Sequence, residues 1–245
     1  MKTYSQLPSQ PISKLLLIGA GLIGGSLTLA LKKAHAVQHV TGVGRRESVM
    51  REALQLGLID DFVAPNTPEY TQAVANADII VLAMPVGQTQ AVLRDLLPHL
   101  APHTIITDAG STKQSVYEDA LVVLNDKINQ FVLAHPIAGR EVNGPSAALA
   151  DLYVGKKIMV CPTIHNTTEQ INTVVAMWQA TGGRVYELDL NAHDAIFAAV
   201  SHVPHVLAYA LMTHVADDAL CADKFAMAGA GFRRFPRIAP ASPAV

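Results

Sequence analysis

The chain has 245 residues, of which 50% are hydrophobic and 16% are charged, and its formal net charge is -2. This composition is too apolar for a disordered polyelectrolyte, and a charge this close to zero argues against a nucleic-acid partner. Cys161 and Cys221 lie far apart, with no further cysteine or paired histidine at metal-ligand spacing. We therefore expect no disulfide framework, no metal site and a reducing, cytoplasmic location.

Short β-branched runs alternate with longer amphipathic segments after a polar tail of residues 1–11, which we expect to be loose. The predicted strands span residues 14–18, 39–43, 78–83, 104–107, 130–134, 157–161 and 184–188. Helices are predicted to begin near Gly21, Glu47, Val86, Lys113, Pro145, Thr168 and Ala192. Several strands are apolar almost throughout, as is typical when helices cover both faces of a parallel sheet. The pattern predicts an α/β fold with a Rossmann-type, doubly wound, mostly parallel sheet.

The composition changes near residue 191, beyond which the sequence is rich in Ala, His and Met and shows no strand pattern. We expect a dinucleotide-binding domain over residues 12–190 and an incomplete helical domain over residues 191–245. The apolar stretch 15–31 contains a glycine turn, and the stretch 196–216 contains histidines and a proline. Neither composition suits a signal peptide or a lipid-facing span, so we expect no membrane association.

A glycine motif marks the first strand-to-helix turn. It reads Gly19-x-Gly21-x-x-Gly24, with Leu22 and Ile23 between the last two glycines. In this context the first glycine permits the tight turn, the second lets the backbone approach a pyrophosphate, and the third lets helix and strand pack closely. The helix N-terminus adds N–H donors and a positive dipole end. These five residues are the candidate dinucleotide cradle.

The end of the second strand bears on which dinucleotide is bound. NAD sites usually place an Asp or Glu there to hold the ribose 2′-hydroxyl. This chain has no acid at that point and continues with Arg45 and Arg46. Two guanidinium groups suit a 2′-phosphate, which favours NADP over NAD; the alternative is a pair of solvated arginines at a helix start.

Two polar residues follow the fourth and fifth strands. Ser111 lies in the turn after residues 104–107 and either donates a hydrogen bond into the cleft or caps the following helix. His135 ends the next strand, where an imidazole can face a cleft and exchange a proton. The carboxyl ends of parallel strands meet at one edge of the sheet, so both side chains are expected on the cofactor side.

Further cationic groups lie near the C-terminus. His202 and His205 are three residues apart in a helical stretch, and we expect them to bind an anionic substrate rather than a metal. Arginines 233, 234 and 237 follow. A guanidinium group suits a substrate carboxylate, although solvated arginines would give the same pattern.

Six segments together carry a resemblance to a known family. They are residues 19–26, 108–113, 135–141, 193–194, 201–205 and 231–239. In this order, they resemble the prephenate/arogenate (cyclohexadienyl) dehydrogenase family of tyrosine biosynthesis over nearly the whole chain. The glycine motif is generic, whereas the segments around His135 and His202 are specific.

The resemblance implies an NAD(P)-dependent oxidative decarboxylation of prephenate to 4-hydroxyphenylpyruvate, or of arogenate to tyrosine. It implies that His135 takes the proton of the substrate hydroxyl and that Ser111 supports this hydroxyl. It further implies that Arg237 binds a substrate carboxylate with help from His202 and His205. The partner is then a small molecule, and a full-length relative is expected to be a homodimer.

Two departures from the family pattern stand out. Arg234 and Pro236 occupy positions where the family commonly has Asp and Thr. Loss of the acid is expected to remove an ion pair that positions Arg237, with Glu141 as a further candidate partner at the substrate site. Family members also continue beyond this point, so we expect a C-terminally truncated chain.

Two alternatives remain open at the sequence level. A β-hydroxyacid-type dehydrogenase would use a catalytic Lys, but no Lys lies between Lys157 and Lys224. A non-catalytic dinucleotide-binding remnant would bind cofactor without turnover.

Overall fold

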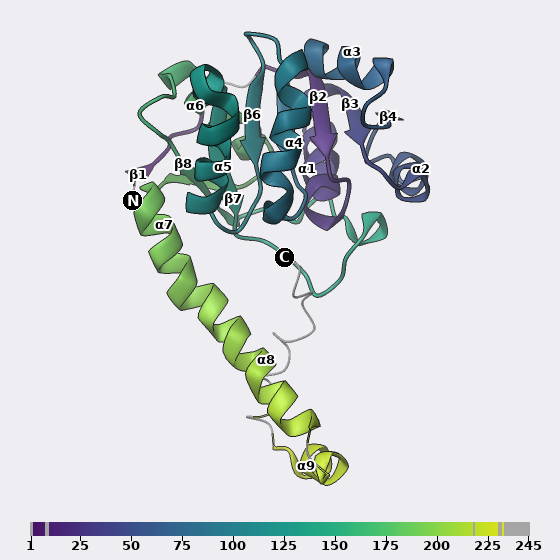
Figure 1. The fold of residues 1–245 in the computed structure, drawn as a ribbon, viewed down its shortest axis with the longest axis vertical. Coiled ribbons are helices and arrows are strands. Elements are labelled where there is room, and N and C mark those ends of the chain that lie inside the picture. The colour runs from purple at the N-terminus through teal and green to yellow at the C-terminus, as the bar shows by residue number, and fades with distance from the viewer. Residues whose placement is uncertain (1, 8–9, 218, 230–231, 233–245) are drawn as a thin grey trace.

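The computed structural model describes residues 2–7, 10–217, 219–229 and 232. Within them, helices pack against a nine-stranded sheet (Figure 1). The strand order is β1-β9-β8-β7-β6-β5-β2-β3-β4. The strands are β1 Lys2–Thr3, β2 Ile12–Ile18, β3 Val37–Val43, β4 Asp61–Val63, β5 Ile79–Leu82, β6 Ile105–Asp108, β7 Phe131–Pro136, β8 Lys157–Cys161 and β9 Arg184–Glu187. All seven predicted strands are present.

The sheet is mostly parallel, as predicted. Strands β4, β3, β2, β5, β6 and β7 run parallel to one another, and β8 runs parallel to β9. The antiparallel pairs are β7 with β8 and β1 with β9. The expectation of a loose N-terminal tail is wrong at its start, because Lys2 and Thr3 pair with β9 and Tyr4 donates a hydrogen bond to Glu187.

The helices are α1 Leu22–Lys33, α2 Glu47–Gln55, α3 Pro68–Asn76, α4 Thr89–Leu96, α5 Gln114–Leu124, α6 Thr168–Ala180, α7 Leu190–Phe197, α8 Val203–Ala216 and α9 Cys221–Met227. Two expectations need correction. The segment at Pro145 forms only a three-residue 3-10 turn, and α4 begins after another such turn, Val86–Gln88. Helix α3 was not predicted, although Thr67 as N-cap and Pro68 at the first helical position are ordinary start signals.

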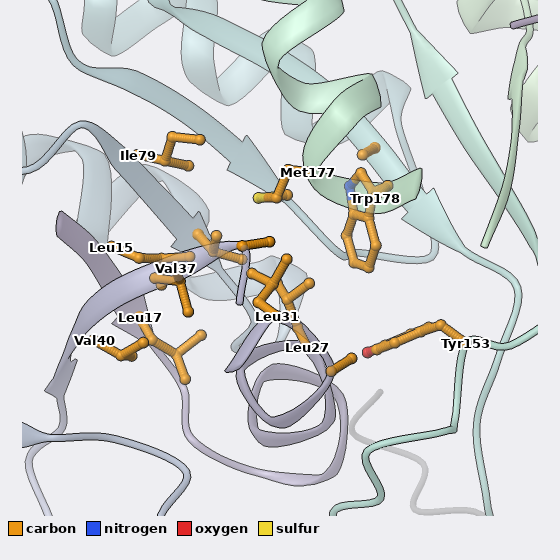
Figure 2. Packing of buried hydrophobic residues seen from close by; sticks show 14 of the residues in the cluster. Leu15, Leu17, Leu27, Leu31, Val37, Val40, Ile79, Tyr153, Met177 and Trp178 are labelled. Carbon is orange, nitrogen blue, oxygen red and sulfur yellow. The ribbon is translucent and has the colours of Figure 1, made fainter. Parts of the chain in front are cut away.

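The core lies on both faces of the sheet because alternate strand residues point to opposite sides. Leu15 and Leu17 of β2 pack in one cluster with residues of α1, α2 and α6, including Trp178 (Figure 2). Leu16 and Ile18 pack in a second cluster with residues of α3, α4 and α5. Each fully buried leucine contributes about 1.5–3 kcal/mol relative to an exposed one. Burial on both faces explains why the strands lack a polar alternation.

Beyond β9 the chain continues as a long helical run that leaves the sheet (Figure 1). Helices α7 and α8 are joined by a π-helical turn, Ala198–His202, into one run, Leu190–Ala216, of 27 residues. By length and composition alone this run is apolar enough to cross a membrane, and little of it is buried. Val200 and Val206 are 67% and 65% exposed. Helix α7 contacts the sheet domain through α5 and His135, whereas Val203, Val206 and Leu207 of α8 are exposed apolar side chains.

Candidate active site

The glycine loop, Ser111 and His135 all lie at one edge of the sheet. Strands β2, β5, β6 and β7 run parallel and adjacent, so their carboxyl ends face the same side. Gly19 follows β2, Ser111 follows β6, and His135 is the penultimate residue of β7. The strand continues two residues further than predicted, through Pro136, with His135 opposite Met159 of β8. This arrangement agrees with the expected cofactor edge.

The glycine loop fits a dinucleotide pyrophosphate. Gly19 has a φ of +102°, and a Cβ there would lie 2.5 Å from the carbonyl oxygen of Ala83. A Cβ at Gly24 would lie 2.2 Å from the carbonyl oxygen of Gly19. Gly21, in contrast, faces open space and is the N-cap of α1 without a capping side chain. The loop is therefore closed on the protein side and leaves the α1 N-terminus open to an anion.

Arg45 and Arg46 are exposed in the turn that follows β3. The Arg45 Nη2 donates to Gln88 Oε1 over 3.5 Å, which links the turn after β3 to the turn after β5 across the end of β2. Glu47, the acid nearest the end of β3, accepts hydrogen bonds from Arg51 one helical turn later. The guanidinium groups thus lie on the side of the cradle where a ribose would be expected.

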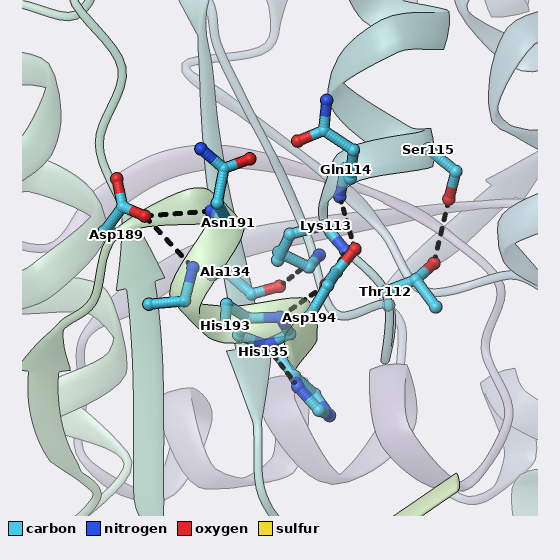
Figure 3. A network of polar contacts seen from close by, with 12 residues as sticks. Thr112, Lys113, Gln114, Ser115, Ala134, His135, Asp189, Asn191, His193 and Asp194 are labelled. Atoms are coloured by element: carbon cyan, nitrogen blue, oxygen red, sulfur yellow. Dashed lines mark hydrogen bonds and ion pairs between the residues drawn. The ribbon is translucent and has the colours of Figure 1, made fainter. Parts of the chain in front are cut away.

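His135 is the start of a chain of hydrogen-bonded side chains (Figure 3). Its Nδ1 lies 2.9 Å from His193 Nε2, and His193 Nδ1 lies 2.7 Å from Asp194 Oδ1. Both partners come from α7, whose N-terminus is fixed by Asp189 through hydrogen bonds from the N–H groups of residues 191 and 192. A residue of the helical run therefore touches the candidate base directly.

Asp194 also caps α5. Its Oδ1 accepts the N–H of Lys113 and its Oδ2 accepts the N–H of Gln114, each over 2.8 Å. The sequence left two roles open for Ser111. The role of helix cap is wrong, because the carboxylate of Asp194, from a distant helix, accepts the N–H groups at the start of α5. Within the described residues, the Ser111 hydroxyl makes no hydrogen bond, so it remains free to donate into the cleft.

A buried ion pair supports the same corner of the sheet. Lys113 is fully buried and pairs with Asp108, the last residue of β6. Its Nζ also donates to the carbonyl oxygen of Ala134 over 2.9 Å, and Asp108 Oδ1 accepts the Ala134 N–H over 3.0 Å. The pair thereby fixes the ends of β6 and β7 relative to each other, directly beside His135.

The surroundings keep His135 neutral. Burial, and then the positive charge of Lys113, lower the pKa of His135 to about 2, while the charge of Asp194 acts in the opposite direction. Burial also lowers the pKa of His193. Burial alone would raise the pKa of Asp194, but hydrogen bonds from Gln114, His193 and Lys113 outweigh it and lower the net value. The site therefore combines two neutral imidazoles with one carboxylate.

This shift makes stability depend on pH. The unfolded chain binds a proton at His135 below its ordinary pKa of 6.5, whereas the folded chain does not until about pH 2. The contribution of the neutral His135 to the free energy of unfolding is therefore complete above pH 6.5 and is lost as the pH is lowered.

We expect the thermal midpoint of His135→Asn to fall less between pH 7 and pH 5 than that of the wild type. His35→Asn, at an exposed position with a φ of +53° that Asn tolerates, is the control and should follow the wild type. An equal fall in all three proteins would contradict the shift.

The π-helical turn brings His202 toward His135. Residues nine apart in a regular helix, such as His193 and His202, lie on opposite sides, because each residue turns the helix by about 100°. The turn Ala198–His202 adds one residue and shifts this phase, and His202 then acts electrostatically on His135. His205 has its Nδ1 2.7 Å from the Ser201 carbonyl oxygen, within its own helix.

The other two predicted substrate residues are Glu141 and Arg237. Glu141 is exposed in the loop after β7. Arg237 lies outside the described residues, as do Arg233 and Arg234. Phe197, which sequence reasoning did not select, packs edge-on against His135 with ring centroids 5.0 Å apart and also covers His193. Lys113, a predicted helix start, and His193 and Asp194, in a segment that matches the family, were not predicted as site residues. The sequence signal that could have identified His193 and Asp194 is an adjacent His-Asp pair shortly after a strand.

The glycine loop, the parallel carboxyl edge and the strand order together define a Rossmann-type nucleotide-binding fold. The family profile described as "Prephenate dehydrogenase, nucleotide-binding domain" matches residues 27–187, and that described as "Prephenate dehydrogenase, dimerization domain" matches residues 189–245. The chain belongs to the prephenate dehydrogenase family.

Similarity to individual relatives supports this family assignment. The chain is 34% identical to a prephenate dehydrogenase of Bacillus subtilis over 94% of its own length and 62% of that protein. It is 33% identical to a cyclohexadienyl dehydrogenase of Zymomonas mobilis over 80% of its length and 65% of that protein. Prephenate dehydrogenase from Aquifex aeolicus, solved in complex with hydroxyphenyl propionate and NAD+, superposes with a TM-score of 0.86 and 30% identity, over 96% of this chain and 81% of that one. The chain thus spans less than two thirds of these curated relatives.

Proposed function

We propose that this chain takes part in the NAD(P)-dependent oxidative decarboxylation of prephenate or arogenate, giving 4-hydroxyphenylpyruvate or tyrosine. The observation that carries the proposal is the neutral His135, held by His193 at the same sheet edge as the glycine loop. Family membership and the names of the relatives support this choice of reaction.

A nicotinamide dinucleotide held in the glycine loop would supply the acceptor for the hydride that leaves the carbinol carbon of the substrate. His135 takes the hydroxyl proton while Ser111 donates a hydrogen bond to the same oxygen. A low pKa makes His135 a weak base, but the hydroxyl becomes strongly acidic as hydride departs, so a weak base suffices. The ring carboxylate then leaves as CO2, its bonding electrons make the ring aromatic, and the proton held by His135 returns to the phenolate oxygen.

The proposed substrate contacts come from the helical run and the loop after β7. His202 supplies a donor near His135, and His205 follows on the same helix. Glu141 and Arg237 complete the proposed set, with the arginine binding a carboxylate. A dianionic substrate such as prephenate needs donors such as His202 and Arg237, because removing its charge from water without partners costs several kcal/mol.

The proposed cofactor is a nicotinamide dinucleotide in the loop of Gly19, Gly21, Leu22, Ile23 and Gly24. The Aquifex relative was solved with NAD+. For this chain we propose a preference for NADP, because guanidinium groups rather than an acid follow β3.

Replacing Arg45 and Arg46 together by Ala tests this preference. NADP affinity should fall about 10- to 100-fold, as expected when a phosphate loses charge-assisted hydrogen bonds, while NAD affinity changes little. Titration of both cofactors by calorimetry gives the two affinities. Arg51→Ala, at an exposed arginine of the following helix α2, serves as the control. Equal losses for NAD and NADP would remove the preference.

We further propose the division of the chain into a dinucleotide-binding domain (12–190) and a helical domain (191–245). The match of the second segment to a dimerization domain and the exposed apolar side chains of α8 support a homodimer formed through this run. Cytoplasmic location accords with a reaction that uses a soluble dinucleotide and a small-molecule substrate.

The proposed function is tested by assaying the purified chain with prephenate and with arogenate, each with NAD and with NADP. Formation of reduced dinucleotide with at least one pair is the expected result. Tight cofactor binding with no turnover of either substrate would instead favour a non-catalytic dinucleotide-binding protein.

A further inference from the structure

The contacts of His193 determine where its protons lie. Asp194 is ionised and can only accept hydrogen bonds, so the 2.7 Å contact requires a proton on His193 Nδ1. His193 is neutral, because burial lowers its pKa. Its second ring nitrogen, Nε2, therefore carries a lone pair and accepts a hydrogen bond.

The same reasoning extends to His135. Since His193 Nε2 is an acceptor, the 2.9 Å contact requires a proton on His135 Nδ1. His135 Nε2 is then left with its lone pair, which is the nitrogen needed to accept a proton from a substrate hydroxyl. Asp194 is in turn fixed by the two N–H groups at the start of α5, so the order of protons is anchored to the backbone.

We propose that His193 and Asp194 are positioning residues that hold His135 in the Nδ1–H tautomer, with Nε2 free to act as the base. The relation is that of the Asp–His pair in a serine protease, in which the partner sets the tautomer and stabilises the imidazolium. Here a second imidazole stands between the carboxylate and the base. When His135 gains a proton at Nε2, its Nδ1–H keeps its acceptor and Asp194 offsets the charge.

The packing favours this role over a purely structural one. His193 is fully buried, and Phe197 lies 4.6 Å from its ring centroid and 5.0 Å from that of His135. The ring of Phe197 packs against both imidazoles, and His193 Nε2 is the hydrogen-bond partner that the described structure gives to His135 Nδ1. Leaving the buried His193 Nε2 and His135 Nδ1 unpaired would be unfavourable, and this cost favours the tautomer of His135 that keeps the contact.

The first test measures the tautomer by nitrogen-15 NMR of the His ring signals, assigned with His135→Asn. In the wild type, His135 should be protonated at Nδ1. In His193→Leu, which removes the acceptor, the His135 signals should shift toward the Nε2–H form. In His193→Gln the amide oxygen can accept from His135, so the Nδ1–H form should persist. His193→Phe replaces the Leu variant if the latter does not fold. Unchanged His135 signals in the acceptor-free variant would overturn the proposal.

The second test is kinetic and rests on the proposed function. His193→Leu should lower kcat about 10- to 100-fold, the range for hydrogen-bond partners that orient metal-ligating histidines, with little change in KM. His193→Gln should recover most of this loss, and the exposed-site control His103→Leu should not differ from the wild type. A wild-type kcat in His193→Leu would contradict the proposal. Absence of turnover in every protein, with the expected tautomers, would contradict the proposed function alone.

Discussion

Replacing His135 by Asn is expected to lower kcat by about 10²–10⁴, the usual contribution of a general base. The Asn amide nitrogen can take the place of His Nδ1 and keep the contact with His193, but the amide cannot take a proton. Cofactor binding should persist, because the glycine loop lies at the end of β2, and strands β5 and β6 lie between β2 and β7 in the sheet. Steady-state kinetics and a dinucleotide titration on the same preparation separate the two effects.

His35→Asn is the matched control for this variant, since it makes the same replacement at an exposed site. It should retain wild-type kinetics. Near-normal turnover of His135→Asn would remove His135 as the base. Loss of dinucleotide binding in His135→Asn would show instead that the substitution disturbs the whole edge of the sheet.

Replacing Lys113 by Met is expected to cost about 3–5 kcal/mol of the free energy of unfolding, because it leaves Asp108 as a buried charge without its partner. The end of β7 would also lose the hydrogen bond that Lys113 Nζ donates to the carbonyl oxygen of Ala134. Urea unfolding measures the loss. Lys33→Met, at an exposed position in the last turn of α1, should change stability by much less.

Adding Asp108→Asn to Lys113→Met should recover part of the stability, because the remaining side chain is neutral and can still accept the Ala134 N–H. A double variant no more stable than Lys113→Met would show that packing around the lysine stem, rather than the unpaired charge, dominates.

Much of the fold follows from local sequence. Runs such as Ile79–Leu82 are apolar at every position, which is the pattern of a strand buried on both faces. The glycine motif predicts a tight strand-to-helix turn, and the structure shows the steric reason: Gly19 and Gly24 have no room for a side chain. Strands β1 and β4, of two and three residues, are too short to produce a period.

The candidate site was predictable only in part. His135 and Ser111 follow strands, and the parallel arrangement brings them to one edge. The cap of α5 by Asp194 was not predictable, because it joins residues about 80 positions apart and replaces the local capping that Ser111 suggested. The π-helical turn before His205 was also hidden, since no residue in Ala198–His202 signals an extra residue in the turn.

The most direct measurement for the proposed reaction is the yield of CO2 and of reduced dinucleotide from the same mixture of purified chain, oxidised dinucleotide and prephenate or arogenate. Oxidative decarboxylation predicts that both products form in equal amounts in the wild type and that both are strongly reduced with His135→Asn. Reduced dinucleotide without CO2 would contradict the proposed oxidative decarboxylation, and equal yields from the wild type and His135→Asn would contradict the role of His135 as the base.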